Sequence, residues 1–135
     1  MNLRFFDPDG VAPPLAGAYS HVARVETGDA VWLHLSGQLA LDADGTLVGP
    51  GDMRTQTEQA FRNLQTLLAA HGATFADVVK ITSFVTDLSE LTAIREVRAG
   101  FLSDPPPTST TVQVAGLALP EAMIEVEVVA VIAAP

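Results

Sequence analysis

The sequence predicts an α+β fold in which two amphipathic helices cover one face of a β-sheet. Two segments carry apolar residues at the spacing of a helix, and five others alternate or are rich in β-branched residues. These segments follow the order ββαβαββ along 135 residues, a length that suits one domain spanning 1–135. Because both helices need an apolar surface to pack on, we expect them to share one face of a single sheet.

Two strands near the N-terminus are predicted to form a hairpin. Residues 19–26 alternate between polar and apolar, and residues 30–36 alternate more clearly, with apolar side chains on one face. The Thr-Gly-Asp sequence at 27–29 has the chemistry of a turn. The glycine- and aspartate-rich stretch 39–51 then predicts a loop that leads into the first helix.

Both helices carry recognisable start and stop signals. The first follows Asp52 or Thr55, either of which can cap it, and its apolar stripe runs to a natural stop at Gly72. The second begins at Ser89 and ends at residues 103–107, because consecutive prolines cannot continue a helix.

Three further strands are predicted at 77–86, 110–115 and 123–132, and the last one has two unlike faces. One face is entirely apolar, whereas the other carries Glu125 and Glu127 beside three large apolar residues. A solvated face would not be so apolar, and a dry core would not hold two glutamates. We therefore expect this face to lie in a subunit interface that has a cleft at its rim.

The chain is acidic and contains no cysteine. Seven Lys and Arg against sixteen Asp and Glu give a net charge of −9, so we expect neither nucleic acid nor a membrane as a partner. Three isolated histidines lack metal-binding spacing, and no dinucleotide or P-loop motif is present, so we predict no metal and no cofactor. No signal peptide or membrane span is apparent, so the predicted location is the cytoplasm.

Two pairs of charged residues are candidates for chemistry or binding. Glu125 and Glu127 are either proton-transfer groups in a pocket or structural carboxylates satisfied by the main chain or a neighbouring arginine. Arg95 and Arg98, one helical turn apart, either bind an anionic ligand or stay in solvent or pair with a glutamate. Spacing alone leaves both choices open.

Short motifs along nearly the whole chain resemble those of the Rid (reactive intermediate deaminase, or YjgF) family. They occur in the order and at the spacing typical of the family. The matching segments are GAYS at 17–20, SGQ at 36–38, QTEQA at 56–60, NL at 63–64, VVK at 78–80, FVTDL at 84–88, PP at 106–107, VQVA at 112–115 and IEVE at 124–127.

The resemblance implies a single Rid-like (chorismate-mutase-like) domain with a six-stranded mixed sheet and two helices on one face. It also implies a homotrimer with ligand clefts between subunits. Active members hydrolyse an amino-acid-derived enamine or imine to a 2-keto acid and ammonia, without metal or cofactor. On this chain, the implied catalytic residue is Glu125, which orients the attacking water, and Tyr19 and Gly37 complete the pocket.

One position departs from the pattern of the active members. These have an arginine just after the prolines that binds the substrate carboxylate, and Ser109 occupies its place here. Arg95 stands where the family has an asparagine near the cleft, so its longer side chain either reaches the carboxylate or remains in solvent. We accordingly predict a ligand site lined by Tyr19, Gly37, Arg95, Ser109 and Thr111, with a specificity altered by the serine.

Two functions from different classes follow. The first is binding of a small carbonyl, enamine or imine compound, with its hydrolysis or tautomerisation. The second is a non-catalytic ligand-binding homotrimer that has lost deaminase activity, so the sequence does not decide whether the chain is an enzyme. An endoribonuclease role, sometimes attached to the family, ranks last because the net charge of −9 opposes RNA binding.

Overall fold

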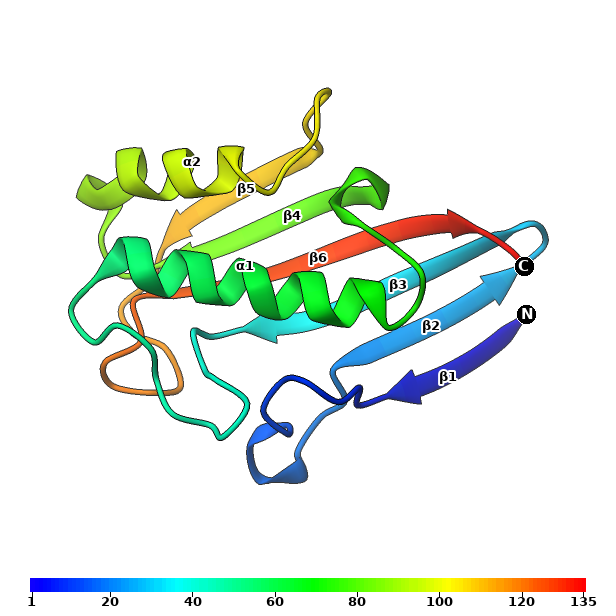
Figure 1. The fold of residues 1–135 in the computed structure, drawn as a ribbon, viewed down its shortest axis with the longest axis horizontal. Coiled ribbons are helices and arrows are strands. Elements are labelled where there is room, and N and C mark those ends of the chain that lie inside the picture. The colour runs from blue at the N-terminus through cyan, green and yellow to red at the C-terminus, as the bar shows by residue number, and fades with distance from the viewer.

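A computed structural model describes residues 1–135 and contains one six-stranded sheet (Figure 1). The strand order is β1-β2-β3-β6-β4-β5, in which β4 and β5 are parallel and every other pair is antiparallel. The sheet is therefore mixed, as the family resemblance implied. The strands are β1 (Asn2–Phe6), β2 (Val22–Thr27), β3 (Ala30–Gln38), β4 (Val78–Val85), β5 (Thr108–Gln113) and β6 (Ile124–Ala133).

The edge strand β1 is not among the five strands that the sequence predicts. It contains five residues and pairs antiparallel with β2, Leu3 opposite Val25. A segment this short gives too few alternations to stand out, so only its partner strand reveals it. The strand predicted at 19–26 also begins later, at Val22, because the main-chain N–H of His21 donates to Asp7 Oδ1 at 2.9 Å.

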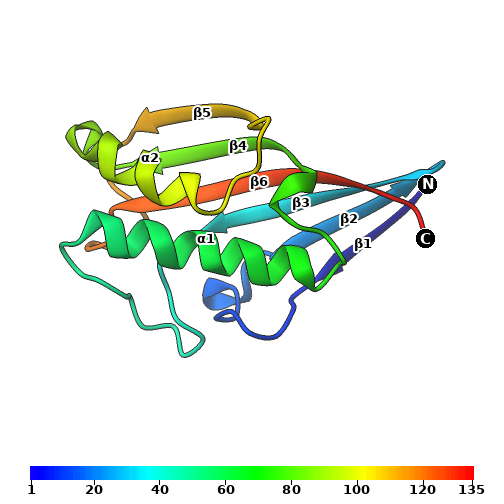
Figure 2. The same cartoon turned by 45° about the horizontal axis from the view of Figure 1, so that its top comes forward.

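Both helices, α1 (Met53–Ala69) and α2 (Leu91–Ala99), lie on the same face of the sheet (Figures 1 and 2). Asp52 is the cap of α1, since its carboxylate accepts hydrogen bonds from the Thr55 N–H at 3.2 Å and the Thr55 hydroxyl at 2.8 Å. A 3₁₀ turn at Leu88–Glu90 precedes α2. The prediction of two helices on one face is confirmed.

The core fills the space between the helices and the sheet. The apolar stripe of α1 is fully buried, and the inner face of the central strand β6 is buried from Ile124 to Ala130. Burial of large aliphatic and aromatic side chains is the main source of stability for such a layer. The fully buried contributors from these two elements are Ala60, Phe61, Leu64, Leu67, Leu68, Ile124, Val126 and Ala130.

The other face of the sheet has no helix over it within the protomer (Figure 2). Large apolar side chains point outward along it from the first strand to the fifth, and we call this surface the open face. Those that remain substantially exposed include Leu3 at 49 %, Phe5 at 62 %, Trp32 at 39 % and Val112 at 39 %. None of the helices has the length and apolar character that a membrane span requires.

Candidate functional site

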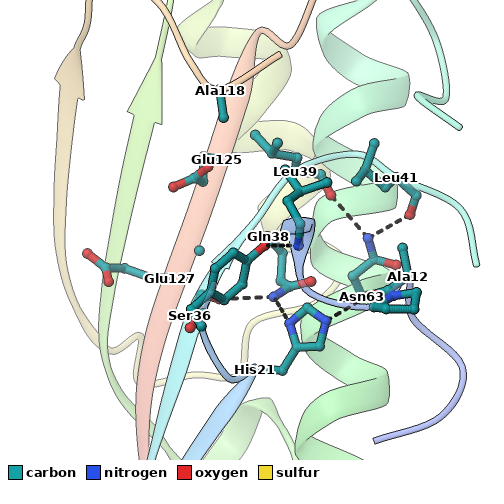
Figure 3. A pocket seen from close by; sticks show the side chains of 14 residues that line it. Ala12, His21, Ser36, Gln38, Leu39, Leu41, Asn63, Ala118, Glu125 and Glu127 are labelled. Atoms are coloured by element: carbon teal, nitrogen blue, oxygen red, sulfur yellow. Dashed lines mark hydrogen bonds between the residues drawn. The ribbon is translucent and has the colours of Figure 1, made fainter. Parts of the chain in front are cut away.

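A hollow of about 380 Å³ opens where β3 ends and β6 begins (Figure 3). The segment between β1 and β2, the end of β3 and the start of β6 supply most of its wall, and α1 contributes Asn63. The hollow collects three of the residues that the sequence predicted for the site, namely Tyr19, Gly37 and Glu125. Its polar lining residues are Tyr19, His21, Ser36, Gln38, Asn63, Glu125 and Glu127.

Gly37 and Glu125 lie against each other across neighbouring strands. The pairing of β3 with β6 is irregular between Leu35 and Gln38, which distorts the strand at Gly37. A Cβ atom on Gly37 would come within 2.7 Å of Glu125 Cδ and 2.8 Å of Cγ. The glycine is therefore required by the space that the Glu125 side chain takes, and it leaves the adjacent main chain open to the hollow.

Glu125 is half-buried and has no cationic partner in the protomer. Burial raises the pKa of its carboxyl group, and repulsion from Glu127 raises it further. Figure 3 shows the two glutamates following one another along β6 beside the hollow. A carboxyl group with these properties exchanges protons closer to neutral pH than an ordinary glutamate does.

A buried hydrogen-bond chain holds the floor of the hollow in place (Figure 3). His21 is 4 % exposed; its Nε2 lies 2.7 Å from the carbonyl oxygen of Ala12, and its Nδ1 lies 3.2 Å from Gln38 Nε2. The same Gln38 amide donates to the Ser36 carbonyl at 3.1 Å, which orients the amide and assigns the histidine proton to Nε2. These two hydrogen bonds give His21 a structural role beneath the hollow.

Asn63 braces the other side of the hollow and was not identified as a site residue from the sequence. Its amide donates to the carbonyl oxygens of Leu39 at 3.1 Å and Leu41 at 2.9 Å, which ties the chain after β3 to α1. Both Asn63 and Gln38 belong to segments that carry the family resemblance. That membership was the available signal, but only the fold shows that these amides line the hollow.

Tyr19 stands at the mouth of the hollow and is 42 % exposed. Its hydroxyl accepts a hydrogen bond from the main-chain N–H of Leu15 at 3.3 Å, and its ring packs edge-on against His21. Because the phenol oxygen acts as the acceptor in that bond, its own O–H remains able to donate to a ligand.

The other predicted site residues lie elsewhere in the protomer. Ser109 pairs with Ile81 and Thr111 with Ser83, and both β4 residues are completely buried on the helix side of the sheet. Glu125 pairs instead with Phe84, which directly follows Ser83 along β4. Since successive strand residues point to opposite faces, Ser109 and Thr111 face the helix side whereas Glu125 faces the open side. One protomer does not bring them together.

Arg95 and Arg98 differ in their surroundings although they share a helix face. Arg95 is exposed, whereas Arg98 is half-buried and its Nη2 donates to Ser109 Oγ at 3.1 Å. Burial, followed by the proximity of Arg95, lowers the pKa of the Arg98 guanidinium. The sequence singled out the two arginines by their spacing, but the contact between Arg98 and Ser109 depends on how α2 packs beside β5.

Comparisons with known proteins agree with this architecture. Protein DfrA of Myxococcus xanthus is 37 % identical over 121 residues, covering 89 % of each chain. A 2-iminobutanoate/2-iminopropanoate deaminase of Dermatophagoides farinae is 34 % identical over 122 residues, covering 90 % of this chain and 91 % of that protein. The crystal structure of RidA from an Antarctic Psychrobacter superposes with a TM-score of 0.83 at 32 % identity, covering 96 % of this chain and 99 % of that one.

A sequence model described as Endoribonuclease L-PSP matches residues 10–132. The match includes the hollow-lining segments and both helices, and it leaves out only short stretches at either end. The solved relatives share the six-stranded mixed sheet with two helices. On these grounds the chain belongs to the Rid (YjgF) family, which that model describes.

Proposed function

We propose that this protein hydrolyses small imines or enamines derived from amino acids, releasing ammonia and a ketone, at a site completed by a second copy of the chain. The observation that carries the proposal is the half-buried Glu125 carboxyl group beside Gly37, with a raised pKa and no cation to neutralise it. Relatives over most of the chain are named 2-iminobutanoate/2-iminopropanoate deaminase, which supports the same chemistry.

The proposed reaction consumes one water and needs no redox step. Glu125 accepts a proton from water as the water oxygen bonds to the carbon of the protonated imine, which gives a neutral carbinolamine. The protonated carboxyl group then returns that proton to nitrogen, and the carbon–nitrogen bond breaks with its electron pair going to nitrogen. Ammonia leaves, and the Glu125 carboxylate accepts the hydroxyl proton as the carbonyl forms. A raised pKa favours the second transfer, because the acid form is then populated nearer to neutral pH.

Tyr19 and Gly37 are proposed to bind the ligand from the same wall. The free O–H of Tyr19 can donate to a ligand oxygen or nitrogen at the mouth of the hollow. Gly37 keeps its main chain accessible because no side chain stands between it and the hollow. These groups position a small planar compound close to Glu125 without adding charge to it.

We further propose that the chain assembles as a homotrimer through the open face. That face carries partly exposed apolar side chains, including Trp32 on β3 and Val131 on β6, which pair with each other across the strands. A contiguous apolar surface of this kind on one face is typical of a subunit interface. Because β5 is an edge strand, a neighbouring copy would place that edge, with its Ser109 and Thr111 and the Arg95 of α2, beside the hollow and so complete the ligand site.

Trapping of the imine that has not been hydrolysed tests this function directly. An amino-acid oxidase generates 2-iminopropanoate or 2-iminobutanoate in the cuvette, and semicarbazide traps whatever imine has not been hydrolysed. The wild-type protein should lower the yield of semicarbazone, and Glu125→Gln should abolish the effect while keeping the side-chain shape. Wild-type protein that binds the corresponding keto acid yet leaves the semicarbazone yield unchanged would instead be the non-catalytic ligand-binding trimer.

A further inference from the structure

We infer that Lys80 of one copy of the chain pairs with Glu127 of a neighbouring copy where their open faces meet. The inference rests on the homotrimer of the proposed function, and it adds the contact between charges that directs this assembly. Glu127 also lines the hollow that holds Glu125, so the neighbouring copy would contribute a cation to the edge of that site.

A belt of polar side chains crosses the open face from β3 through β6 and β4 to β5. It consists of His34, Glu127, Lys80, Thr82 and Thr110. The first four each adjoin a residue that is buried on the helix side, so they point to the open face, and Thr110 pairs with Thr82. The first four also line a second hollow, of about 170 Å³, so Glu127 borders both hollows.

Apolar side chains lie on the open face on both sides of this belt. Trp32 pairs with Val131 on one side, and Phe84 pairs with Val112 on the other. All four remain partly exposed in the protomer. Because the belt lies between these two apolar pairs, a second copy that covers both pairs also covers the belt.

The belt contains one cation and one anion, and neither has an oppositely charged partner within the protomer. All four ion pairs of the chain involve arginines, and none involves Lys80 or Glu127. Arg95 and Arg98 are also without an ion pair, but they belong to α2 on the helix side of the sheet. Lys80 is therefore the unpaired cation of the open face.

The direction of the Lys80 side chain favours a partner on another copy. Strand β4 lies between β6, which carries Glu127, and the edge strand β5. Lys80 Nζ reaches toward β5, where it donates to Thr110 Oγ1 at 2.9 Å, and so points away from Glu127 of its own chain. The ammonium group keeps two further donors for a carboxylate, at the edge that a neighbouring copy would place beside the hollow.

Covering the open face makes a pair between copies favourable. A charge that is taken out of water destabilises an interface unless it gains a partner of opposite sign. Each copy offers one cation and one anion in its belt, so Lys80 of one copy and Glu127 of the next satisfy each other. Two chains of net charge −9 otherwise repel, and this local contact supplies an attraction that the whole molecule lacks.

Charge reversal on separate chains tests the pair. The belt of Lys80→Glu holds two carboxylates, and the belt of Glu127→Lys holds two ammonium groups. Each variant alone should need a protein concentration about tenfold or more above that of the wild type to assemble, because like charges then meet across the interface. An equimolar mixture of the two should assemble at a lower concentration than either alone, because an interface between unlike chains restores opposite charges. Light scattering over a dilution series measures the mass.

Two further proteins separate a contact between copies from one within a copy. A chain that carries both Lys80→Glu and Glu127→Lys should assemble like the wild type. If the pair formed within one copy, this double variant would assemble but the mixture of single variants would not, and the inference would be overturned. Arg62→Glu, at an exposed position of α1, is the control and should leave the mass unchanged.

Cross-linking of the wild type tests the same contact without any substitution. Lys80 is the only lysine of the chain, so a carbodiimide, which joins an amine to a carboxylate in contact with it, has few amines to use. Protein assembled from equal parts of unlabelled and isotope-labelled chains should give Lys80–Glu127 cross-linked peptides that carry one label of each kind. Mass spectrometry that finds no such mixed peptide would contradict the pair even if every variant misfolds.

Failure of this inference is distinguishable from failure of the proposed function. Wild-type protein with the mass of one chain would refute the homotrimer and the ion pair together. A wild-type trimer whose variants do not reassemble on mixing, and which gives no mixed cross-linked peptide, would overturn the ion pair alone. A trimer that shows the pair but does not lower the yield of semicarbazone would refute the hydrolase and support the contact.

Discussion

A methyl group placed on Gly37 would lie 2.7 Å from the carboxyl carbon of Glu125, closer than real Cβ atoms approach any non-bonded atom. The two residues sit on the neighbouring strands β3 and β6, where the pairing is irregular. Their contact couples the shape of the hollow to the position of the acidic group, because any side chain at 37 must displace Glu125.

Gly37→Ala should therefore abolish imine hydrolysis by moving the Glu125 carboxyl group, with only a modest change in the midpoint of thermal unfolding. The semicarbazide assay and differential scanning calorimetry measure the two effects. Gly116→Ala is the matched control, because a Cβ at Gly116 meets no atom within 4 Å and its main chain has no positive φ. Full activity in Gly37→Ala would contradict the role assigned to this contact.

The raised pKa of Glu125 has a defined effect on stability. The folded state holds this proton more tightly than the unfolded state, whose glutamate has the ordinary value. The stabilising contribution is thus complete below the unfolded pKa and is lost as pH rises through the folded pKa. Relative to Glu125→Gln, the wild-type free energy of unfolding should fall over this window. Urea titrations of both proteins from pH 4 to pH 8 measure the difference, and a difference independent of pH would contradict the shift.

Glu127→Gln should move the pH dependence of catalysis. Repulsion from Glu127 is the second cause of the raised Glu125 pKa, so removing that charge should lower the pKa. Since Glu125 acts first as a base, the acid limb of the profile of kcat/KM against pH should shift to lower pH. Glu121→Gln is the control, because Glu121 is exposed and belongs to neither the hollow nor β6.

Val131→Lys should disrupt the proposed trimer. Val131 pairs with Trp32 on the open face near the centre of the sheet, so a lysine there would place a charge in the apolar interface. Light scattering should give the mass of the wild type as about three chains and that of the variant as about one. Ala69→Lys, at an exposed position of α1, should leave the mass unchanged.

The gain from placing an arginine at position 109 should depend on whether Arg98 is present. In Ser109→Arg alone, the new guanidinium lies beside Arg98 and Arg95, so repulsion limits any gain in imine hydrolysis. In Ser109→Arg combined with Arg98→Gln, that repulsion is reduced and the gain in kcat/KM should be larger. Rates of imine hydrolysis by wild type, the two single variants and the double variant give the coupling free energy, and additivity of the two changes would contradict the proximity of these side chains.

Local patterns in the sequence determined much of the fold. The apolar stripe of α1 and the apolar inner face of β6 can be recognised in the sequence. Side chains on one face recur about every 3.6 residues along a helix and at every second residue along a strand. The short strand β1 spans only five residues, too few for its alternation to identify a strand, and its pairing with β2 reveals it. Tyr19, Gly37 and Glu125 were found through family motifs, and the fold places them around one hollow.

Only the tertiary structure decided which of the candidate site residues lie on the helix side of the sheet and which lie on the open face. Alternation shows that a strand has two faces, but the register between strands decides which face meets the helices. The parallel pairing of β5 with β4 puts Ser109 on the helix side, under Arg98, and the antiparallel pairing of β6 with β4 puts Glu125 on the other. Contacts between residues distant in sequence arise from such packing, which no local period encodes.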